Sequence, residues 1–148
     1  PGLTLPRLME MNRSKLEALY ARGEPRPIPD GESDGRATLA PGTAMGRGSQ
    51  AIFGLFWQGK VFDRKNGMLV NKILGVLKAV PAKVFVGASW FDDKPSILID
   101  YKGASWLCAP VRDEIRMVAP DLYLGLAYVR TPGKPRAPLM FALDFSRS

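Results

Sequence analysis

Short β-rich runs, each closed by a turn, follow one another from Lys83 to the end of the chain. Asp, Pro and Gly, which separate the runs, are typical of turns. The sequence has no long helical pattern between the runs, which disfavours a doubly wound parallel sheet. We therefore expect a mainly β protein, in which an antiparallel sheet curls or closes into a small barrel. The five runs are KVFVGASWF, SILIDYK, EIRMV, LYLGLAYV and LMFALDF.

Further strands are expected before Lys83. GKVFD and NGMLVNKIL flank Asn66-Gly67, and this dipeptide is a strong hairpin signal. Arg36 to Leu39 is a candidate short strand. These segments would bring the sheet to about eight strands, within the usual range for a small barrel.

Two helices are expected beside the barrel. Apolar residues recur at helical spacing from Leu5 to Arg22, which predicts one amphipathic N-terminal helix. SQAIFGLFW is interpreted as one further short helix, with Ser49 as its cap. Residues 23–35 are rich in Pro, Gly and acidic residues and are expected to form a loop.

A chain of 148 residues fits a single domain with one core. We expect that domain to cover residues 1–148, with the helix in 1–22, the loop in 23–35 and the barrel in 36–148. No apolar stretch reaches the length of a membrane span, and the first residues lack the order of a secretory signal. These patterns favour a cytoplasmic protein.

The composition excludes several kinds of site. The chain has no histidine and a single cysteine, Cys108, so the usual zinc, haem and copper ligand sets are missing. The same lack rules out a Ser-His-Asp or Cys-His catalytic site within this chain. GRGSQ at 46–50 does not have the spacing of a dinucleotide-binding loop. Asp92 and Asp93, followed by Lys94, are a weak cation signal. We expect no metal and no cofactor.

The positive charge is concentrated in one part of the chain. The net charge is +7, and residues 51–83 hold six basic side chains against Asp63 alone. Such a stretch can be a solvated face that keeps the protein soluble. Alternatively, residues 60–83 meet an anionic lipid surface. Nucleic acid is a weaker expectation, and the sequence says nothing about the oligomeric state.

The run VRDEIRMV places four charges beside apolar residues. Successive strand side chains point to opposite faces, so Asp113 shares a face with Ile115 and Met117. If that face is the interior, Asp113 lies inside, where an unpaired carboxylate costs several kcal/mol. The opposite face would be an exterior charge ladder of Arg112, Glu114 and Arg116. The candidate partners of Asp113 are Arg112, Arg116, Arg130 and Tyr101. Alternatively, Asp113 caps a strand end or pairs with Arg116 at the rim.

Alternation sorts two other runs in the same way. In SILIDYK it places Tyr101 with Ile97 and Ile99, and Asp100 on the other face. In LMFALDF it places Asp144 with Met140 and Ala142, opposite Leu139, Phe141, Leu143 and Phe145. The aromatic residues near strand ends either pack in the core or line the mouth of a pocket; they are Trp57, Trp90, Phe91 and Trp106.

Five segments together resemble the GXWXG/DUF4334 type of small lipocalin-like proteins. They are FWQGKVF at 56–62, SILIDY at 96–101, RDEIR at 112–116, LYLG at 122–125 and FALDF at 141–145. The resemblance implies a calycin-like barrel with an internal apolar cavity and no settled activity. By position, the motif residues would be Trp57, Lys60, Phe62, Asp113 and Arg116.

Two functions follow as hypotheses. The first is binding of a small hydrophobic or amphipathic molecule, such as a lipid or fatty acid, in a barrel cavity. Lys60 or Arg116 would then meet a carboxylate or phosphate. The expected binding residues are Trp57, Lys60, Phe62, Trp90, Asp100, Asp113, Arg116 and Tyr123.

The second hypothesis is a cofactor-independent enzyme, for example a cyclase, isomerase or dehydratase, that uses the same cavity. Asp113 or Glu114 would act as base, and Tyr101 or Tyr123 as proton donor. A third expectation is an interaction module that meets an anionic surface.

Overall fold

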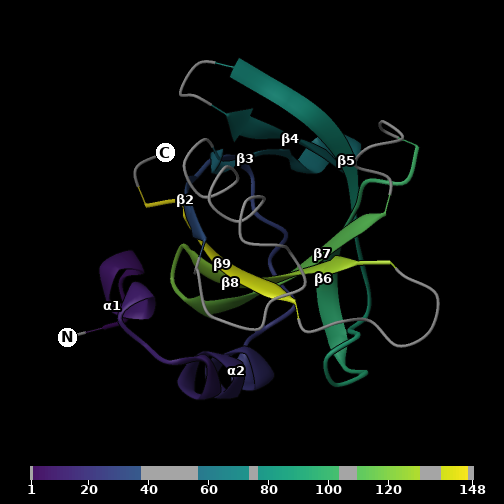
Figure 1. Cartoon of the computed structure of the whole chain (residues 1–148). Helices are drawn as coiled ribbons and strands as arrows, with labels where there is room; N and C mark the ends of the chain where they lie inside the picture. Colours follow the sequence, from purple (N-terminus) through teal and green to yellow (C-terminus); the bar gives the residue numbers. More distant parts are fainter. Residues whose placement is uncertain (1, 38–56, 74–76, 104–109, 131–137, 147–148) are drawn as a thin grey trace.

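One antiparallel sheet of nine strands curls into a nearly closed barrel in the computed structural model of the chain (Figure 1). The structure describes residues 2–37, 57–73, 77–103, 110–130 and 138–146. The order of strands around the sheet is β1-β3-β4-β5-β6-β7-β8-β9-β2. The strands are β1 (Gly31–Glu32), β2 (Asp34–Ala37), β3 (Trp57–Asp63), β4 (Met68–Ile73), β5 (Leu77–Ala88), β6 (Pro95–Asp100), β7 (Val111–Ala119), β8 (Leu122–Val129) and β9 (Leu139–Asp144).

The strands predicted after Lys83 and on both sides of Asn66-Gly67 are confirmed. Of the candidate strand from Arg36 to Leu39, residues 36–37 belong to β2, and residues 38–39 lie outside the described part. The five runs after Lys83 form β5 to β9, and each pairs with the next in antiparallel register. The predicted hairpin is formed by β3 and β4. Its turn contains a short 3₁₀ helix, η1 (Arg64–Asn66), and ends at Gly67, whose φ of 64° lies in the left-handed region that glycine favours.

One short segment, residues 31–37, brings the two ends of the sheet together. Its first part, β1, pairs with β3, and its second part, β2, pairs with β9. Between them, the Ser33 N–H donates to the Lys60 carbonyl at 3.1 Å, and the Ser33 hydroxyl accepts from the Lys60 N–H at 3.0 Å. We call residues 31–37 the seam. The segment 23–35 that was expected to be a loop therefore contains pairing: Glu24 forms an isolated bridge with Met117, and β1 begins at Gly31.

The N-terminal helix is interrupted, so the prediction of one helix over residues 5–22 is wrong. The structure has α1 (Leu5–Met9) and α2 (Arg13–Arg22). Asn12 begins the second helix, because its side chain accepts a hydrogen bond from the Lys15 N–H at 2.9 Å. The interpretation of SQAIFGLFW as a helix falls mostly on residues outside the described part, and its last residue, Trp57, begins β3. In the part of the chain that the structure describes, no helix is both long and apolar enough to cross a membrane.

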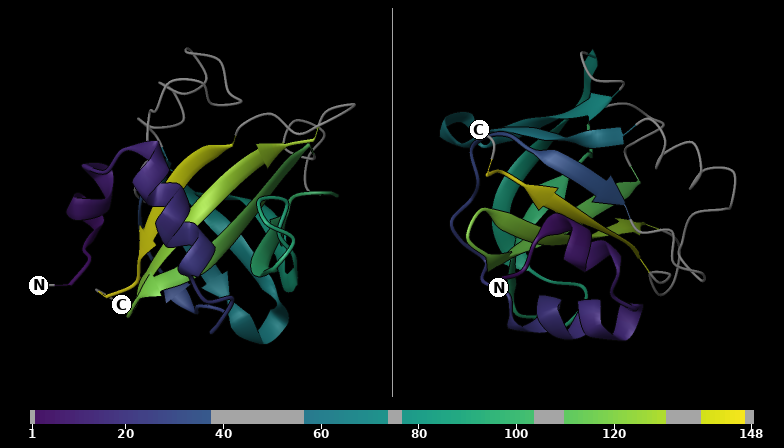
Figure 2. Two further views of the ribbon diagram at one scale, coloured as in Figure 1. Left: turned by 90° about the horizontal axis from the view of Figure 1, so that it is seen from below. Right: turned by 90° about the vertical axis from the view of Figure 1, so that its left-hand side faces the viewer.

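The two faces of the sheet bury two separate apolar clusters. The inner face gathers residues such as Phe62, Ile97 and Phe141 inside the barrel. The outer face of β7, β8 and β9 is covered by α1 and α2 (Figure 2), where Leu16 packs among residues such as Leu124. The predicted alternation in β6 and β9 is confirmed, since Tyr101 and Phe141 belong to the apolar cluster of the inner face and Met140 to the apolar cluster of the outer face.

Gly35 provides the test of how tightly the seam closes. A Cβ atom added there would lie 2.6 Å from the Gly59 Cα and 2.6 Å from the ring of Trp57. We expect Gly35→Ala to lower the free energy of unfolding by roughly 1–3 kcal/mol, because backbone and a buried ring must move. Urea unfolding measures the change. Gly2→Ala is the control, since nothing lies within 4 Å of a Cβ there. Equal midpoints for the two variants would contradict the close approach at the seam.

Candidate functional site

Asp113 on β7 points into the barrel, as alternation predicts, and its residue is 4% exposed. Its carboxylate oxygen Oδ2 lies 2.9 Å from the Lys60 Nζ and accepts from the Tyr101 hydroxyl at 3.2 Å. Tyr101 was among the expected partners of Asp113. Lys60 was not, and the alternative pairing of Asp113 with Arg116 at the rim is wrong.

A β-bulge in β3 turns Lys60 inward. The register with β4 shifts between Trp57 and Gly59, where one extra residue enters the strand. Gly59 has a φ of 133°, which few other residues adopt. Because of this extra residue, Trp57 and Lys60 both face the interior although they are three positions apart. Lys60 is 1% exposed.

Asn71 on β4 links these side chains, and the sequence reasoning missed it. Its Oδ1 accepts from the Lys60 Nζ at 2.8 Å and from the Trp57 Nε1 at 3.0 Å. Its Nδ2 donates to the Tyr101 hydroxyl and to the Val80 carbonyl, both at 2.9 Å. The signal available in the sequence was an amide in the middle of the apolar run MLVNKIL. We call this set the inner cluster: Trp57, Lys60, Asn71, Tyr101 and Asp113.

The inner cluster also depends on strained backbone in β5. The register between β4 and β5 shifts next to Asn71, and Val80 in this irregularity has a φ of 58°. A β-branched residue in that region is a genuine outlier. The irregularity carries the carbonyl that accepts from the Asn71 amide, so strained backbone holds that amide in place.

Burial and charge act in opposite directions on Lys60. Desolvation lowers the pKa of Lys60, and the nearby Asp113 carboxylate partly offsets this effect. The Lys60 Nζ also lies 5.4 Å from the ring centroids of Trp57, Tyr101 and Phe141. These aromatic faces favour a cation.

One polar atom of the inner cluster lacks a partner. Among the described residues, no hydrogen-bonding group meets the Asp113 Oδ1, although this oxygen is buried. A buried polar group without a partner costs roughly 1–3 kcal/mol. This oxygen is therefore the position at which the cluster can accept a further hydrogen bond.

Glu114 and its neighbours point to the outer face, as alternation predicts, but they are buried there. Glu114 is 0% exposed and accepts from the Tyr20 hydroxyl at 2.8 Å and the Trp90 N–H at 2.9 Å. Ser89 and Arg112 also donate to it. Burial and the Glu114 charge raise the pKa of Tyr20. Glu114 is therefore turned away from the inner cluster and is not placed to serve as a base there.

Arg116 fixes the covering segments to the outside of the barrel. Its guanidinium donates to both Asp92 carboxylate oxygens, at 2.8 and 2.7 Å, and to the Tyr20 carbonyl at 3.0 Å. It also donates to the carbonyls of Lys94 and Pro95. Arg116 thus holds α2 and the turn between β5 and β6 and cannot meet a ligand inside. We call this set the outer cluster: Tyr20, Ser89, Arg112, Glu114 and Arg116.

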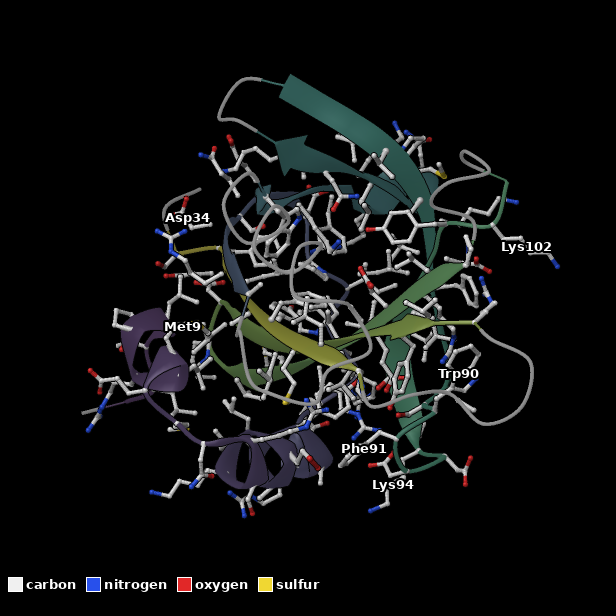
Figure 3. All side chains as sticks on the ribbon, viewed as in Figure 1. Met9, Asp34, Trp90, Phe91, Lys94 and Lys102 are labelled. Atoms are coloured by element: carbon white, nitrogen blue, oxygen red, sulfur yellow. The ribbon has the colours of Figure 1, made fainter. Side chains whose placement is uncertain are left out.

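The remaining candidate residues are dispersed. Trp90 lies with Phe91 and Lys94 around the turn between β5 and β6 (Figure 3), and its exposed ring stacks on the Arg112 guanidinium at 4.0 Å. Asp100 pairs with Arg130 at 3.2 Å.

Phe62 and Tyr123, the last two predicted binding residues, face the interior. Trp106 lies outside the described residues. Phe62 packs on Phe145, with 5.7 Å between the ring centroids. Tyr123 donates to the Pro27 carbonyl at 2.6 Å, and burial raises the pKa of Tyr123 to about 12.

Residues 60–83 are less cationic at the surface than the sequence suggests. Lys60 is inside, and Lys72 is buried against Glu32 at 3.2 Å and Asp34 at 3.8 Å. Basic side chains that are exposed in this stretch are Arg64, Lys65 and Lys83. In the described part of the chain, no group of three acidic or cysteine side chains is placed to hold a metal ion.

Comparison with known proteins supports the fold. The chain is similar to the crystal structure of a protein from Thermomonospora curvata, with a TM-score of 0.60 and 21% sequence identity. The match covers 91% of this chain and 88% of that one. No protein-family profile matches the sequence, and no curated protein matches it significantly.

A double-mutant cycle tests the pair of Lys60 and Asp113. Lys60→Met should lower the free energy of unfolding by about 3–5 kcal/mol, because it leaves a buried carboxylate without its counter-ion. Lys60→Met combined with Asp113→Leu should recover much of that loss, since apolar side chains then replace the whole pair. Urea unfolding of the four proteins measures the coupling. Additive losses would show that the two charges do not interact in the folded protein.

Proposed function

We propose that this protein binds a small, mainly apolar molecule inside the barrel, with the polar end of the molecule at the inner cluster. The observation that carries the proposal is the buried pair of Lys60 and Asp113, 2.9 Å apart in an aromatic interior. A buried ion pair is often no more stabilising than apolar side chains of the same volume. Stability alone therefore does not account for it.

The backbone around the pair supports the same proposal. A bulge at Gly59 and the strained Val80 both position groups of the inner cluster. Bulges and strained residues are over-represented where a side chain must be aimed at a ligand. Both features lie beside polar residues of the interior.

The side chains of the interior suit an apolar ligand. The aromatic residues of the inner apolar cluster are Trp57, Phe62, Tyr101, Tyr123, Phe141 and Phe145. Binding sites for small molecules are mostly apolar, with a few polar groups that fix the orientation of the ligand. The resemblance to GXWXG/DUF4334 proteins implies a barrel cavity as well, and four of its five motif residues face inward here. They are Trp57, Lys60, Phe62 and Asp113.

Binding can be tested with N-phenyl-1-naphthylamine, a neutral apolar probe that fluoresces in apolar surroundings. We expect the probe to bind inside the barrel, so a change to an interior ring should alter its affinity. Trp57→Phe should weaken binding of the probe severalfold, whereas Trp90→Phe, on the outer face, should leave the affinity nearly unchanged. Thermal unfolding checks that both variants fold. No increase in probe fluorescence with the folded wild-type protein would overturn the proposal.

A cofactor-independent enzyme is the second candidate, favoured by the hydrogen bond of 3.2 Å between Tyr101 and Asp113. The unpaired Asp113 oxygen would take a proton from carbon next to a ketone, and Tyr101 would return one. Wild-type protein should then exchange the α-hydrogens of 2-decanone in D₂O, followed by NMR. Asp113→Asn should abolish this exchange, whereas Glu114→Gln should retain it. Absence of exchange above the rate in buffer would leave binding as the function.

A further inference from the structure

We infer that the ligand of the inner cluster is a neutral molecule whose polar end donates a hydrogen bond, such as an alcohol or an N–H compound. This inference rests on the proposed function and names the class of molecule that the same site takes. It follows from a count of the donors and acceptors in the inner cluster, and it differs from the fatty-acid-like ligand that the sequence favoured.

Lys60 has no hydrogen left for a ligand. An ammonium group carries three donors. They go to Asn71 Oδ1 at 2.8 Å, to the Tyr101 hydroxyl at 2.7 Å and to Asp113 Oδ2 at 2.9 Å. A carboxylate or phosphate would have to displace one of these buried partners, so the positive charge of Lys60 does not make this an anion site.

The other donors of the inner cluster are used as well. The Trp57 indole N–H goes to Asn71 Oδ1, and the two Asn71 amide hydrogens go to Val80 and Tyr101. The Tyr101 hydroxyl accepts from both Lys60 and Asn71, and its own hydrogen goes to an acceptor of the same set, Asp113 Oδ2 at 3.2 Å or Asn71 Oδ1 at 3.3 Å. Each donor in the set thus has a partner within the protein.

What the inner cluster offers is an acceptor. The Asp113 Oδ1 is buried, belongs to a side chain that is 5% exposed, and has no partner among the described residues. A carboxylate oxygen accepts from a hydroxyl or an N–H and repels another anion. A site built to hydrogen-bond a polar group rejects analogues without that group, because its own buried atom is then left unpaired.

The amide at position 113 should reverse this preference. In Asp113→Asn, Lys60 and Tyr101 still require an acceptor where Oδ2 was, so the amide oxygen takes that position. The amide NH₂ then replaces Oδ1, and the acceptor presented to the ligand becomes a donor. Asp100→Asn is the matched control, since Asp100 lies at the end of neighbouring β6 and pairs with Arg130.

The experiment is displacement of N-phenyl-1-naphthylamine by three molecules of equal chain length: 1-decanol, 2-decanone and decanoate. From wild type and Asp100→Asn, 1-decanol should displace the probe at a concentration at least about tenfold lower than the other two. In Asp113→Asn, the ratio of the displacing concentrations of 2-decanone and 1-decanol should change at least about tenfold in favour of the ketone. Decanoate should also displace the probe at a lower concentration than it does from wild type. Thermal unfolding with and without the probe confirms that each variant folds.

The outcomes separate the inference from the proposed function. If the probe binds but decanoate or 2-decanone displaces it from wild type as well as 1-decanol does, the donor preference is overturned and binding in the barrel stands. The same holds if Asp113→Asn leaves the order of the three molecules unchanged. If the probe does not bind to wild type at all, it is the proposed function that fails.

Discussion

An ammonium and a carboxylate face each other inside this barrel, and much of the interior is organised around them. Two charges taken out of water lose several kcal/mol of hydration each, and their attraction compensates only when the remaining hydrogen-bonding capacity is also met. Asn71 and Tyr101 supply most of that capacity. They are held in turn by an indole N–H and a backbone carbonyl. The interior is thus mostly apolar, with polar side chains gathered in the inner cluster, an arrangement suited to binding the polar end of an apolar molecule.

The four charged residues of RDEIR lie on both faces of β7. Asp113 completes the inner cluster, while Arg112, Glu114 and Arg116 face outward under α2 and the turn between β5 and β6. The outer cluster is as thoroughly buried as the inner one, but its acid, Glu114, is surrounded by donors. This difference separates a carboxylate with a structural role from one with capacity for a ligand.

Alternation and turn chemistry were sufficient to predict most strands, the hairpin and the face that Asp113 shares with Ile115, but they left open whether that face is the interior. They were not sufficient for Lys60, because a bulge at Gly59 changes which face the following residues occupy. The signal in WQGKVF was the single glycine inside a strand, which often marks a bulge. Asn71 was missed for a related reason, since a lone amide in an apolar strand has no periodic signature. The break between α1 and α2 depends on the side chain of Asn12, which accepts from the Lys15 N–H and so begins a second helix. The spacing of the apolar residues does not mark this break. The burial of Glu114 and Arg116 required knowing that a helix lies over β7, a tertiary contact that no local pattern contains.

The seam connects the closure of the barrel to the position of Lys60 in the inner cluster. Ser33, which lies between β1 and β2, forms hydrogen bonds with the main chain of Lys60 through both its backbone N–H and its hydroxyl. Separation of the seam from β3 would break these hydrogen bonds and so loosen the main chain of Lys60. A molecule bound at the inner cluster, as proposed, would therefore also stabilise the closed seam, because opening the seam would disturb the main chain of Lys60.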